Sequence, residues 1–169
     1  MYNDIENLGM ADKFVDDILE IINHIKLFEG FSVDEVRVLC HYMECYAAPR
    51  NYTLLQEGDD GDYLLLLLSG GVEVRKRMPG QGEKLIAEIG VGATLGEMSM
   101  IDGNPRYASC ITTVPTDFAI FKRESLNDIL VQMPRLGNKF LLILLQLMTS
   151  RLRNTCERFL PTGVYGAPI

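Results

Sequence analysis

Three residues between positions 90 and 109 have the types and spacing of a binding site for a small anion. Gly96 and Glu97 are adjacent, and Arg106 follows nine residues after the glutamate. A glycine at position 96 lets the backbone approach a ligand closely, because no Cβ stands in the way. If a short helical turn begins at Glu97, its first amide N–H groups point toward one spot, where the helix dipole favours an anion. We expect Arg106 to return on the next strand and to close this spot with a guanidinium that matches two phosphate oxygens.

The carboxylate of Glu97 must have a different task, since it only accepts hydrogen bonds and cannot bind phosphate. Beside a phosphate, an acceptor of this kind suits a sugar hydroxyl. The helix N-terminus, the arginine and the carboxylate together predict a pocket for a ribose that carries one compact phosphate. The alternative is that Gly96 is an ordinary turn glycine and that Arg106 is a surface charge.

The composition limits the classes of partner. The chain has 169 residues, which is the length of one domain with a real core, and its net charge is −7 from 16 basic and 23 acidic residues. A surface that binds nucleic acid needs a positive field, so we expect no nucleic-acid partner. A small anion in a local pocket is compatible with this charge.

No metal, disulfide or membrane segment is predicted. The four cysteines are scattered, without the spacing of a zinc site, and the acidic turn at 58–62 lacks the ligand pattern of a calcium loop. The N-terminus has no apolar core of signal-peptide length, and the longest apolar stretch is far shorter than the ~20 residues that cross a bilayer. We therefore expect a cytoplasmic protein.

The hydrophobic pattern divides the chain into helical and strand-rich parts. Apolar residues recur at intervals of three and four over residues 11–26, which is the spacing of one helix face. Ser32 and Glu35 have the spacing of a capping box, which predicts a second helix to about residue 43. From residue 46 to 122, short apolar stretches alternate with turn residues, as in a small antiparallel sandwich or barrel. Strands are predicted at 44–48, 53–56, 63–68, 72–77, 84–89, 106–113 and 116–122.

We therefore predict an α+β fold, in which an antiparallel β-barrel or jelly roll (a double-stranded β-helix) has helices on both sides in the sequence. The apolar run 64–68 should be buried on both faces. The expected organisation is a flexible N-terminus at 1–10, N-terminal helices at 11–43, the barrel at 44–122 with the anion-binding segment at 90–109, hinge and dimer helices at 123–159, and an unstructured tail at 160–169.

The helix predicted from Pro134 to about residue 159 has two apolar faces. One of them, including Phe140 and Leu144, can pack on the strands. The other is a seam with the alternating spacing of a coiled coil, which predicts a homodimer. The alternative is that the N-terminal helix covers this seam within one chain. The seam consists of Leu141, Leu145, Met148, Leu152, Thr155 and Phe159.

The sequence also resembles a known family. LGEMSMIDGNPRYAS, residues 95–109, is similar to the phosphate-binding cassette of cyclic nucleotide-binding domains, whose usual pattern is FGE, about eight residues, PR, any residue and Ala. EGDDGDYLLLLLSGGVEV, residues 57–74, resembles the strand, turn and strand that the family builds around two glycines. The resemblance extends from about residue 28 to 159. It implies ligand contacts at Gly96, Glu97, Met98, Ser99, Arg106, Tyr107 and Ala108.

A second similarity lies near the end of the last helix. RLRNTCERF, residues 151–159, resembles the segment of bacterial catabolite activator proteins in which a Thr-Ser pair hydrogen-bonds adenine. The resemblance implies that Thr155 contacts the base, while Cys156 replaces the serine with a weaker donor. The alternative is that Thr155 only occupies a seam position.

Two positions depart from the family pattern. Leu95 replaces an aromatic residue, and Tyr107 stands where the family often has Ala, Ser or Thr. A threonine there is associated with cGMP, so the resemblance implies cAMP as the preferred ligand and cGMP as the lesser one. A tyrosine can also cover the ligand or fill the pocket.

The resemblance implies a regulatory sensor, without a DNA-binding output, that relays ligand binding through its C-terminal helix to an unknown effector. The alternative is a degenerate fold that binds no nucleotide and acts as a structural or protein-interaction domain. No nucleophile with an adjacent base is visible, so we expect no enzyme.

Overall fold

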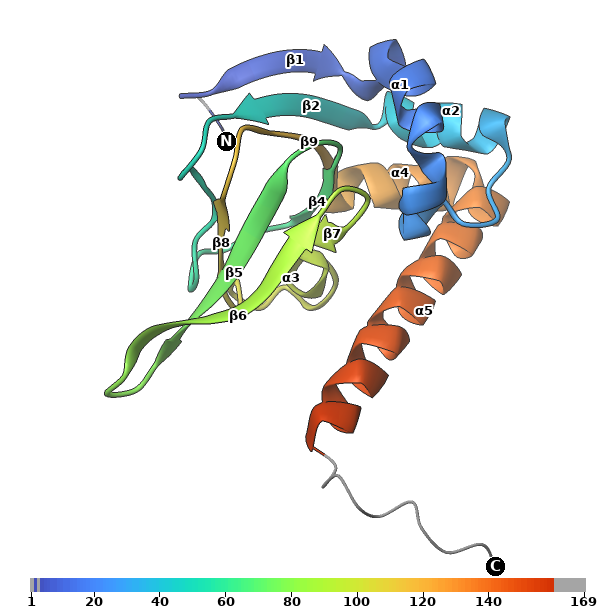
Figure 1. The fold of residues 1–169 in the computed structure, drawn as a ribbon. Coiled ribbons are helices and arrows are strands. Elements are labelled where there is room, and N and C mark those ends of the chain that lie inside the picture. Colours follow the sequence, from blue (N-terminus) through green and yellow to red (C-terminus); the bar gives the residue numbers. More distant parts are fainter. Residues whose placement is uncertain (1, 3, 160–169) are drawn as a thin grey trace, which may run out of the picture.

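Two antiparallel β-sheets with helices gathered at one end form the computed structural model, which describes residues 2 and 4–159 (Figure 1). A five-stranded sheet has the order β1-β2-β9-β4-β7, and a four-stranded sheet has the order β3-β8-β5-β6. This is the predicted α+β class with antiparallel strands. The strands are β1 (Glu6–Met10), β2 (Met43–Ala48), β3 (Thr53–Leu55), β4 (Tyr63–Leu67), β5 (Gly71–Met78), β6 (Gly82–Gly90), β7 (Thr94–Leu95), β8 (Ser109–Thr112) and β9 (Thr116–Lys122).

The helices come from both sides of the strand-rich part of the sequence. Figure 1 shows α1, α2 and α4 beside one end of the sheets, and the long helix α5 extending from that end. Short 3₁₀ turns connect the N-terminal helices. The helical elements are η1 (Ala11–Phe14), α1 (Val15–Glu20), η2 (Ile22–His24), η3 (Lys26–Phe28), α2 (Val33–His41), α3 (Glu97–Asp102), α4 (Arg123–Gln132) and α5 (Pro134–Phe159).

Strand β4 lies at the centre of the core. Leu64 and Leu66 pack in the cluster formed with the helices, whereas Leu65 and Leu67 pack in the cluster between the two sheets. All four of these leucines are fully buried, as predicted, whereas Leu68 at the end of the predicted run is only partly buried. Burying side chains of this size stabilises the fold by about 1.5–3 kcal/mol each. The strand therefore joins the helical layer to the walls of the β-sheets.

Two local signals in the sequence are confirmed at helix starts. The side chain of Ser32 accepts a hydrogen bond from the backbone N–H of Glu35, and the Glu35 carboxylate accepts one from the backbone N–H of Ser32. Pro134 is the first residue of α5, where its missing N–H costs no intrahelical hydrogen bond.

The structure corrects the expected flexible N-terminus for residues 6–10, which form a strand. Strand β1 pairs antiparallel with β2 along the edge of the five-stranded sheet, with a bulge between Asn7 and Gly9. This segment is ordered by hydrogen bonds to β2, which is distant in the sequence. Its own polar sequence therefore carries no local signal of the strand.

The single helix predicted over 11–26 is also wrong. Helix α1 ends at Glu20, and Ile25 has an extended ψ of 89°. The backbone carbonyl of His24 lies against Gly92, where a Cβ would come within 2.0 Å of the carbonyl oxygen. After α1 the chain forms the 3₁₀ turn η2, and the end of this turn packs against the loop between β6 and β7.

The predicted strand at 106–113 is shorter than expected. Strand β8 begins at Ser109, so Arg106 lies in the loop between α3 and β8 and not on a strand. The backbone of Arg106 is nevertheless fixed, since its N–H donates to Asp59 O and its carbonyl accepts from Gly58 N.

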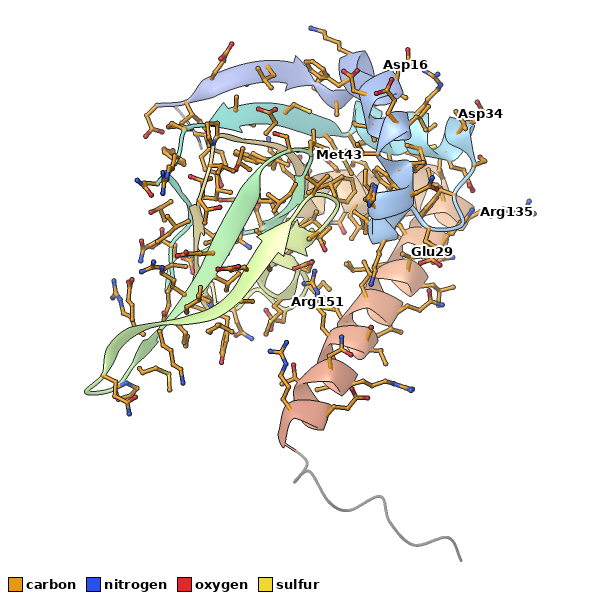
Figure 2. All side chains as sticks on the ribbon, viewed as in Figure 1. Asp16, Glu29, Asp34, Met43, Arg135 and Arg151 are labelled. Atoms are coloured by element: carbon orange, nitrogen blue, oxygen red, sulfur yellow. The ribbon has the colours of Figure 1, made fainter. Side chains whose placement is uncertain are left out.

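Helix α5 has the two predicted apolar faces. Phe140 and Leu144 are buried in the core, whereas Leu141, Leu145 and Leu152 are exposed by 36%, 62% and 63%. Within residues 2 and 4–159, the N-terminal helix therefore does not cover the seam. Figure 2 shows Asp16, Glu29, Asp34 and Arg135 on the outer surface of the helical end, while Met43 lies inside it. The predicted tail at 160–169 lies outside the described residues.

Candidate functional site

Gly96 forms the N-cap of α3 with a left-handed backbone, φ +81°. A Cβ at this position would lie 2.5 Å from Arg106 Nη1, so any side chain would be strained and would also displace the guanidinium. The predicted helical turn at Glu97 is confirmed as α3. The glycine thus allows the helix N-terminus and the arginine to approach each other.

The Arg106 side chain is buried, with 4% of its surface exposed. Nη1 donates to Gly96 O at 2.8 Å, and Nη2 donates to Tyr63 O at 2.9 Å. The guanidinium carbon lies 4.4 Å from the centre of the Tyr63 ring. At Gly61 a Cβ would lie 2.2 Å from Nη2, so this glycine leaves room for the guanidinium. Arg106 is therefore held in place by backbone carbonyls, an aromatic ring and two glycines.

Glu97 is also buried, with 2% exposed, at the first position of α3. Its carboxylate accepts a hydrogen bond from Thr94 Oγ1 and forms an ion pair of 2.9 Å with Arg151 Nη1 on α5. Arg151 Nη2 also donates to Thr94 O at 2.7 Å. The sequence analysis did not select Arg151, although it lies one helical turn before Thr155 on the same face.

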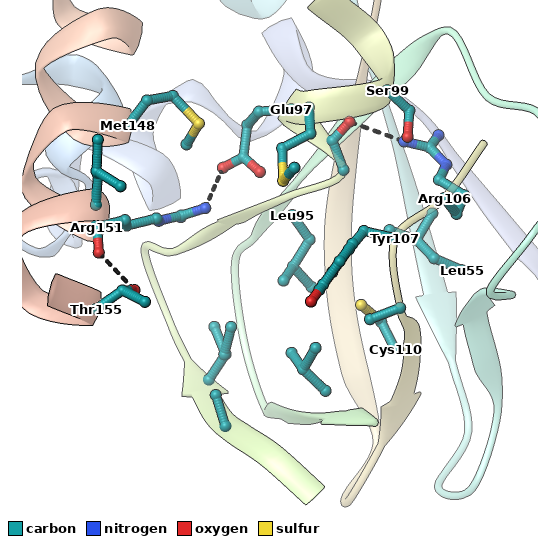
Figure 3. Close-up of a pocket in the computed structure, with 17 residues that line it drawn as sticks. Leu55, Leu95, Glu97, Ser99, Arg106, Tyr107, Cys110, Met148, Arg151 and Thr155 are labelled. Carbon is teal, nitrogen blue, oxygen red and sulfur yellow. Dashed lines mark hydrogen bonds and ion pairs between the residues drawn. The ribbon is translucent and has the colours of Figure 1, made fainter. Parts of the chain in front are cut away.

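These residues surround one cavity of about 520 Å³, which Figure 3 shows between α5, α3 and the strands. This volume is in the range of small-molecule sites in proteins. All eight predicted site residues line it, so the structure brings Gly96, Met98, Ser99, Ala108 and the others together; their role in binding stays a prediction. Apolar side chains form most of the remaining wall: Leu55, Val74, Ala87, Ile89, Leu95, Cys110, Met148 and Leu152.

Tyr107 is held at the rim of the cavity. Lys76 Nζ lies 4.3 Å from the centre of its ring and donates to Tyr107 O at 2.6 Å. Lys76 also forms an ion pair of 2.8 Å with Glu57. The backbone N–H of Arg77 and the Lys76 ammonium donate to the Glu57 carboxylate and lower its pKa. The ring is 60% exposed and, in Figure 3, lies across the cavity between Leu95 and Cys110. The sequence analysis did not select Lys76.

Two further polar groups of the wall are defined by their neighbours. Thr155 Oγ1 donates to Arg151 O at 2.8 Å, so its hydroxyl proton is used within α5 and its lone pairs remain acceptors. Burial raises the pKa of the Cys110 thiol to about 12, which keeps it protonated and unreactive at neutral pH.

The described part of the chain contains neither a membrane-spanning helix nor a cluster of metal ligands. No helix there has the length and apolar character needed to cross a membrane. No group of three His, Cys, Asp or Glu side chains in residues 2 and 4–159 is placed to hold a metal ion.

Comparison with known proteins agrees with this geometry. A solved cyclic nucleotide-binding domain from Methylobacillus flagellatus KT is 56% identical, with a TM-score of 0.86 over 100% of this chain and 94% of that one. The catabolite activator protein of Thermus thermophilus is 28% identical, with a TM-score of 0.70 over 79% of this chain and 61% of that one. A CRP-like cAMP-activated global transcriptional regulator of Mycobacterium tuberculosis is 28% identical over 136 residues, which are 80% of this chain and 59% of the relative.

The chain thus spans about three fifths of the length of this curated relative. The family profile of the cyclic nucleotide-binding domain matches residues 47–133, which is more than half of the chain and includes the whole segment from β3 to α4. The chain therefore belongs to the cyclic nucleotide-binding domain family.

Proposed function

We propose that this domain binds a cyclic nucleotide in the cavity, with cAMP preferred to cGMP, and relays binding through α5 to a partner. Arg106 carries the proposal. Its guanidinium is buried, and among the described residues no carboxylate forms an ion pair with it. A buried charge costs free energy unless an opposite charge compensates it. A cyclic phosphate at this wall would supply that charge. It would also accept hydrogen bonds from the guanidinium N–H groups that do not donate to the carbonyls of Gly96 and Tyr63.

The ribose and the base have separate parts of the wall. Glu97 offers the acceptor that a ribose hydroxyl needs, beside the phosphate position at Gly96 and Arg106. The apolar wall beyond them suits the faces of a purine, with Thr155 at its α5 side and Tyr107 at its rim. This arrangement separates the anionic end of the ligand from its flat, apolar end.

The preference for cAMP is supported by two observations. The M. tuberculosis relative is described as cAMP-activated, and a Thermus thermophilus relative, 29% identical over 127 residues, is a cyclic AMP receptor protein. At position 107, a tyrosine stands in place of the threonine that the family associates with cGMP. Its bulky ring does not reproduce the short hydroxyl contact to the guanine amino group.

The relay is proposed to pass through the ion pair of Arg151 and Glu97. In the described part of the chain, Glu97 is the only carboxylate that forms an ion pair with Arg151. A ribose hydroxyl that donates to Glu97 therefore changes this ion pair. Helix α5 then takes the position that best accommodates the ligand. The ligand shifts α5 only by the difference in its affinity for the two positions.

The output surface is proposed to be the exposed seam of α5. Leu141, Leu145 and Leu152 present an apolar stripe that a second copy of the same helix would cover. A homodimer formed in this way places the relay at the interface. The effector protein would then recognise the ligand-bound arrangement of the two helices.

A second candidate function is a non-binding interaction domain. It is favoured by the contacts that the site residues already make: Glu97 pairs with Arg151, and Tyr107 extends across the cavity. In either case we infer that the protein is a regulatory and not a catalytic domain. Incubation with the protein should therefore leave cAMP chemically intact.

The melting temperature with cAMP, cGMP and linear AMP separates these functions. A ligand at about 100 times its dissociation constant stabilises by about 2.7 kcal/mol, which for a domain of this length is a shift of about 5–10 °C. The proposal expects this shift with cAMP and a smaller one with cGMP at equal concentration. The absence of a shift with any of them would favour the non-binding interaction domain.

A further inference from the structure

Arg106 separates two cavities. The front cavity is the one described above, and a rear cavity on the other side of the arginine has a volume of about 500 Å³. Tyr2, Tyr52, Asp60, Asp62 and Tyr63 are among the residues that line the rear cavity, and Arg106 lines both. The other residues of the rear cavity can therefore influence Arg106, the residue that carries the proposed function.

The aromatic ring of Tyr2 occupies this rear side. Its centre lies 5.5 Å from that of Tyr46, 5.3 Å from that of Phe118 and 6.4 Å from that of Tyr63. Its hydroxyl donates to Leu54 O, and the hydroxyl oxygens of Tyr2 and Tyr63 are 3.4 Å apart. Burial and the neighbouring Tyr63 raise the pKa of the Tyr2 phenol, so it remains a neutral donor.

Tyr63 connects Tyr2 to the arginine. Its ring packs edge-on against the Tyr2 ring and lies 4.4 Å from the guanidinium carbon of Arg106. Its carbonyl accepts the hydrogen bond from Arg106 Nη2. The position of Tyr63 therefore fixes two of the contacts that hold the guanidinium.

The negative charges of the rear cavity make the support of Arg106 by Tyr2 and Tyr63 necessary. Asp59, Asp60 and Asp62 line the rear cavity, and their carboxylates attract a guanidinium more strongly than neutral carbonyls do. If the Tyr2 ring were absent, Tyr63 would lose packing, and the guanidinium would gain room to move toward these aspartates. Arg106 could then turn away from Gly96 and from the phosphate position.

We propose that Tyr2 is a positioning residue for Arg106: its ring forms part of the wall of the rear cavity, supports Tyr63 and keeps the guanidinium directed at the front cavity. The effect of Tyr2 on ligand affinity rests on the proposed function, whereas its effect on the position of Arg106 does not. The N-terminal segment thereby contributes to phosphate recognition without contacting the ligand.

The test compares Tyr2→Ala with Tyr2→Phe, which keeps the ring. Calorimetry measures binding of cAMP and of adenosine, which lacks the phosphate. Tyr2→Ala should lose about tenfold in cAMP affinity and less than twofold in adenosine affinity, whereas Tyr2→Phe should stay within twofold for both. Phe31→Ala truncates another half-buried aromatic side chain and controls for general destabilisation, so it should leave the ratio of the two affinities unchanged.

A second measurement needs no ligand. In the ligand-free protein, NMR follows hydrogen exchange of the Arg106 Nε–H group, which should be at least fivefold faster in Tyr2→Ala than in the wild type and unchanged in Tyr2→Phe. Equal exchange in all three proteins, or an equal loss of cAMP and adenosine affinity, would overturn the role of Tyr2. If the wild type binds no cAMP, the proposed function fails, while the exchange rates still decide whether Tyr2 positions Arg106.

Discussion

Arg151 on α5 and Glu97 on α3 form an ion pair of 2.9 Å across the mouth of the cavity. The glutamate is 3% exposed and the arginine 44%, so the pair joins a buried acceptor to a donor at the surface. Arg151 also donates to the carbonyl and hydroxyl of Thr94. Three contacts from one side chain thus attach the last turns of α5 to the cavity wall, and Figure 3 shows the one to Glu97.

Replacing Arg151 by methionine should release this attachment. The Glu97 carboxylate would remain buried with only Thr94 as a partner, which costs about 1–3 kcal/mol. Hydrogen–deuterium exchange should become faster in residues 148–158 of the ligand-free protein and stay unchanged in the sheets. Arg153→Met, at an exposed position on the same helix, is the matched control. Equal exchange in the two variants would show that the ion pair does not hold α5.

Gly96→Ala should damage the site beyond the cost of backbone strain. A left-handed residue with a Cβ costs about 1–2 kcal/mol, and here the Cβ also meets Arg106 Nη1. Gly80→Ala is the matched control, because Gly80 has φ +73° and open space around it. Both variants should melt at lower temperature, but only Gly96→Ala should lose cAMP affinity. A similar loss in Gly80→Ala would mean that the clash with Arg106 is unimportant.

The α5 seam should control association. Leu145→Glu together with Leu152→Glu places charges in the proposed interface and should convert a dimer into a monomer in sedimentation velocity at micromolar concentration. Val131→Glu changes a side chain that is 82% exposed on α4 and should leave the dimer intact. A wild-type protein that sediments as a monomer would contradict the proposed homodimer.

Glu35 links α2 to α5 in a pH-dependent way. Lys139 Nζ donates to its carboxylate at 2.6 Å and, with the backbone N–H of Ser32, lowers the pKa of Glu35. A lowered pKa in the folded state stabilises the protein above the unfolded pKa of about 4.3, and this stability is lost as the pH falls through the folded value. Because about a third of the Glu35 side chain, 34%, is exposed to solvent, the contribution is only about 0.2–1 kcal/mol.

Glu35→Gln tests this sign, because glutamine keeps the capping box but not the charge. Urea unfolding should show the variant less stable than the wild type at pH 7, with the difference vanishing at pH values below the folded pKa. Glu29→Gln, an exposed neighbour, is the control. A difference that grows as the pH falls would contradict the assigned direction.

Much of the fold could be predicted because its signals are local or periodic. The capping box at Ser32, the apolar run in β4 and Pro134 at the start of α5 each act within a few residues, and each is confirmed. Strand β1 escaped prediction because its order comes from pairing with β2. The predicted helix over 11–26 is broken after Glu20, and His24 packs against Gly92, a contact that lies far away in the sequence and has no local signal.

The site residues also divide into those with a local sequence signal and those that depend on contacts distant in the sequence. Gly96, Glu97 and Arg106 could be selected because they share one segment with a recognisable spacing, although Arg106 lies in a loop and not on a strand. Arg151 and Lys76 were missed because each reaches the site across tertiary contacts, to Glu97 and to Tyr107. No pattern within their own segments indicates those partners.

The central claim is that the phosphate of a cyclic nucleotide binds at Arg106, and calorimetric titration of cAMP into the wild type and Arg106→Ala tests it most directly. Removing one partner of a buried charge-assisted contact costs about 2–5 kcal/mol, so the variant should lose at least thirtyfold in affinity. Arg135→Ala, an exposed arginine at the helical end, should bind as the wild type does. Circular dichroism checks that each variant is folded. Equal cAMP affinity of the wild type and Arg106→Ala would contradict the account.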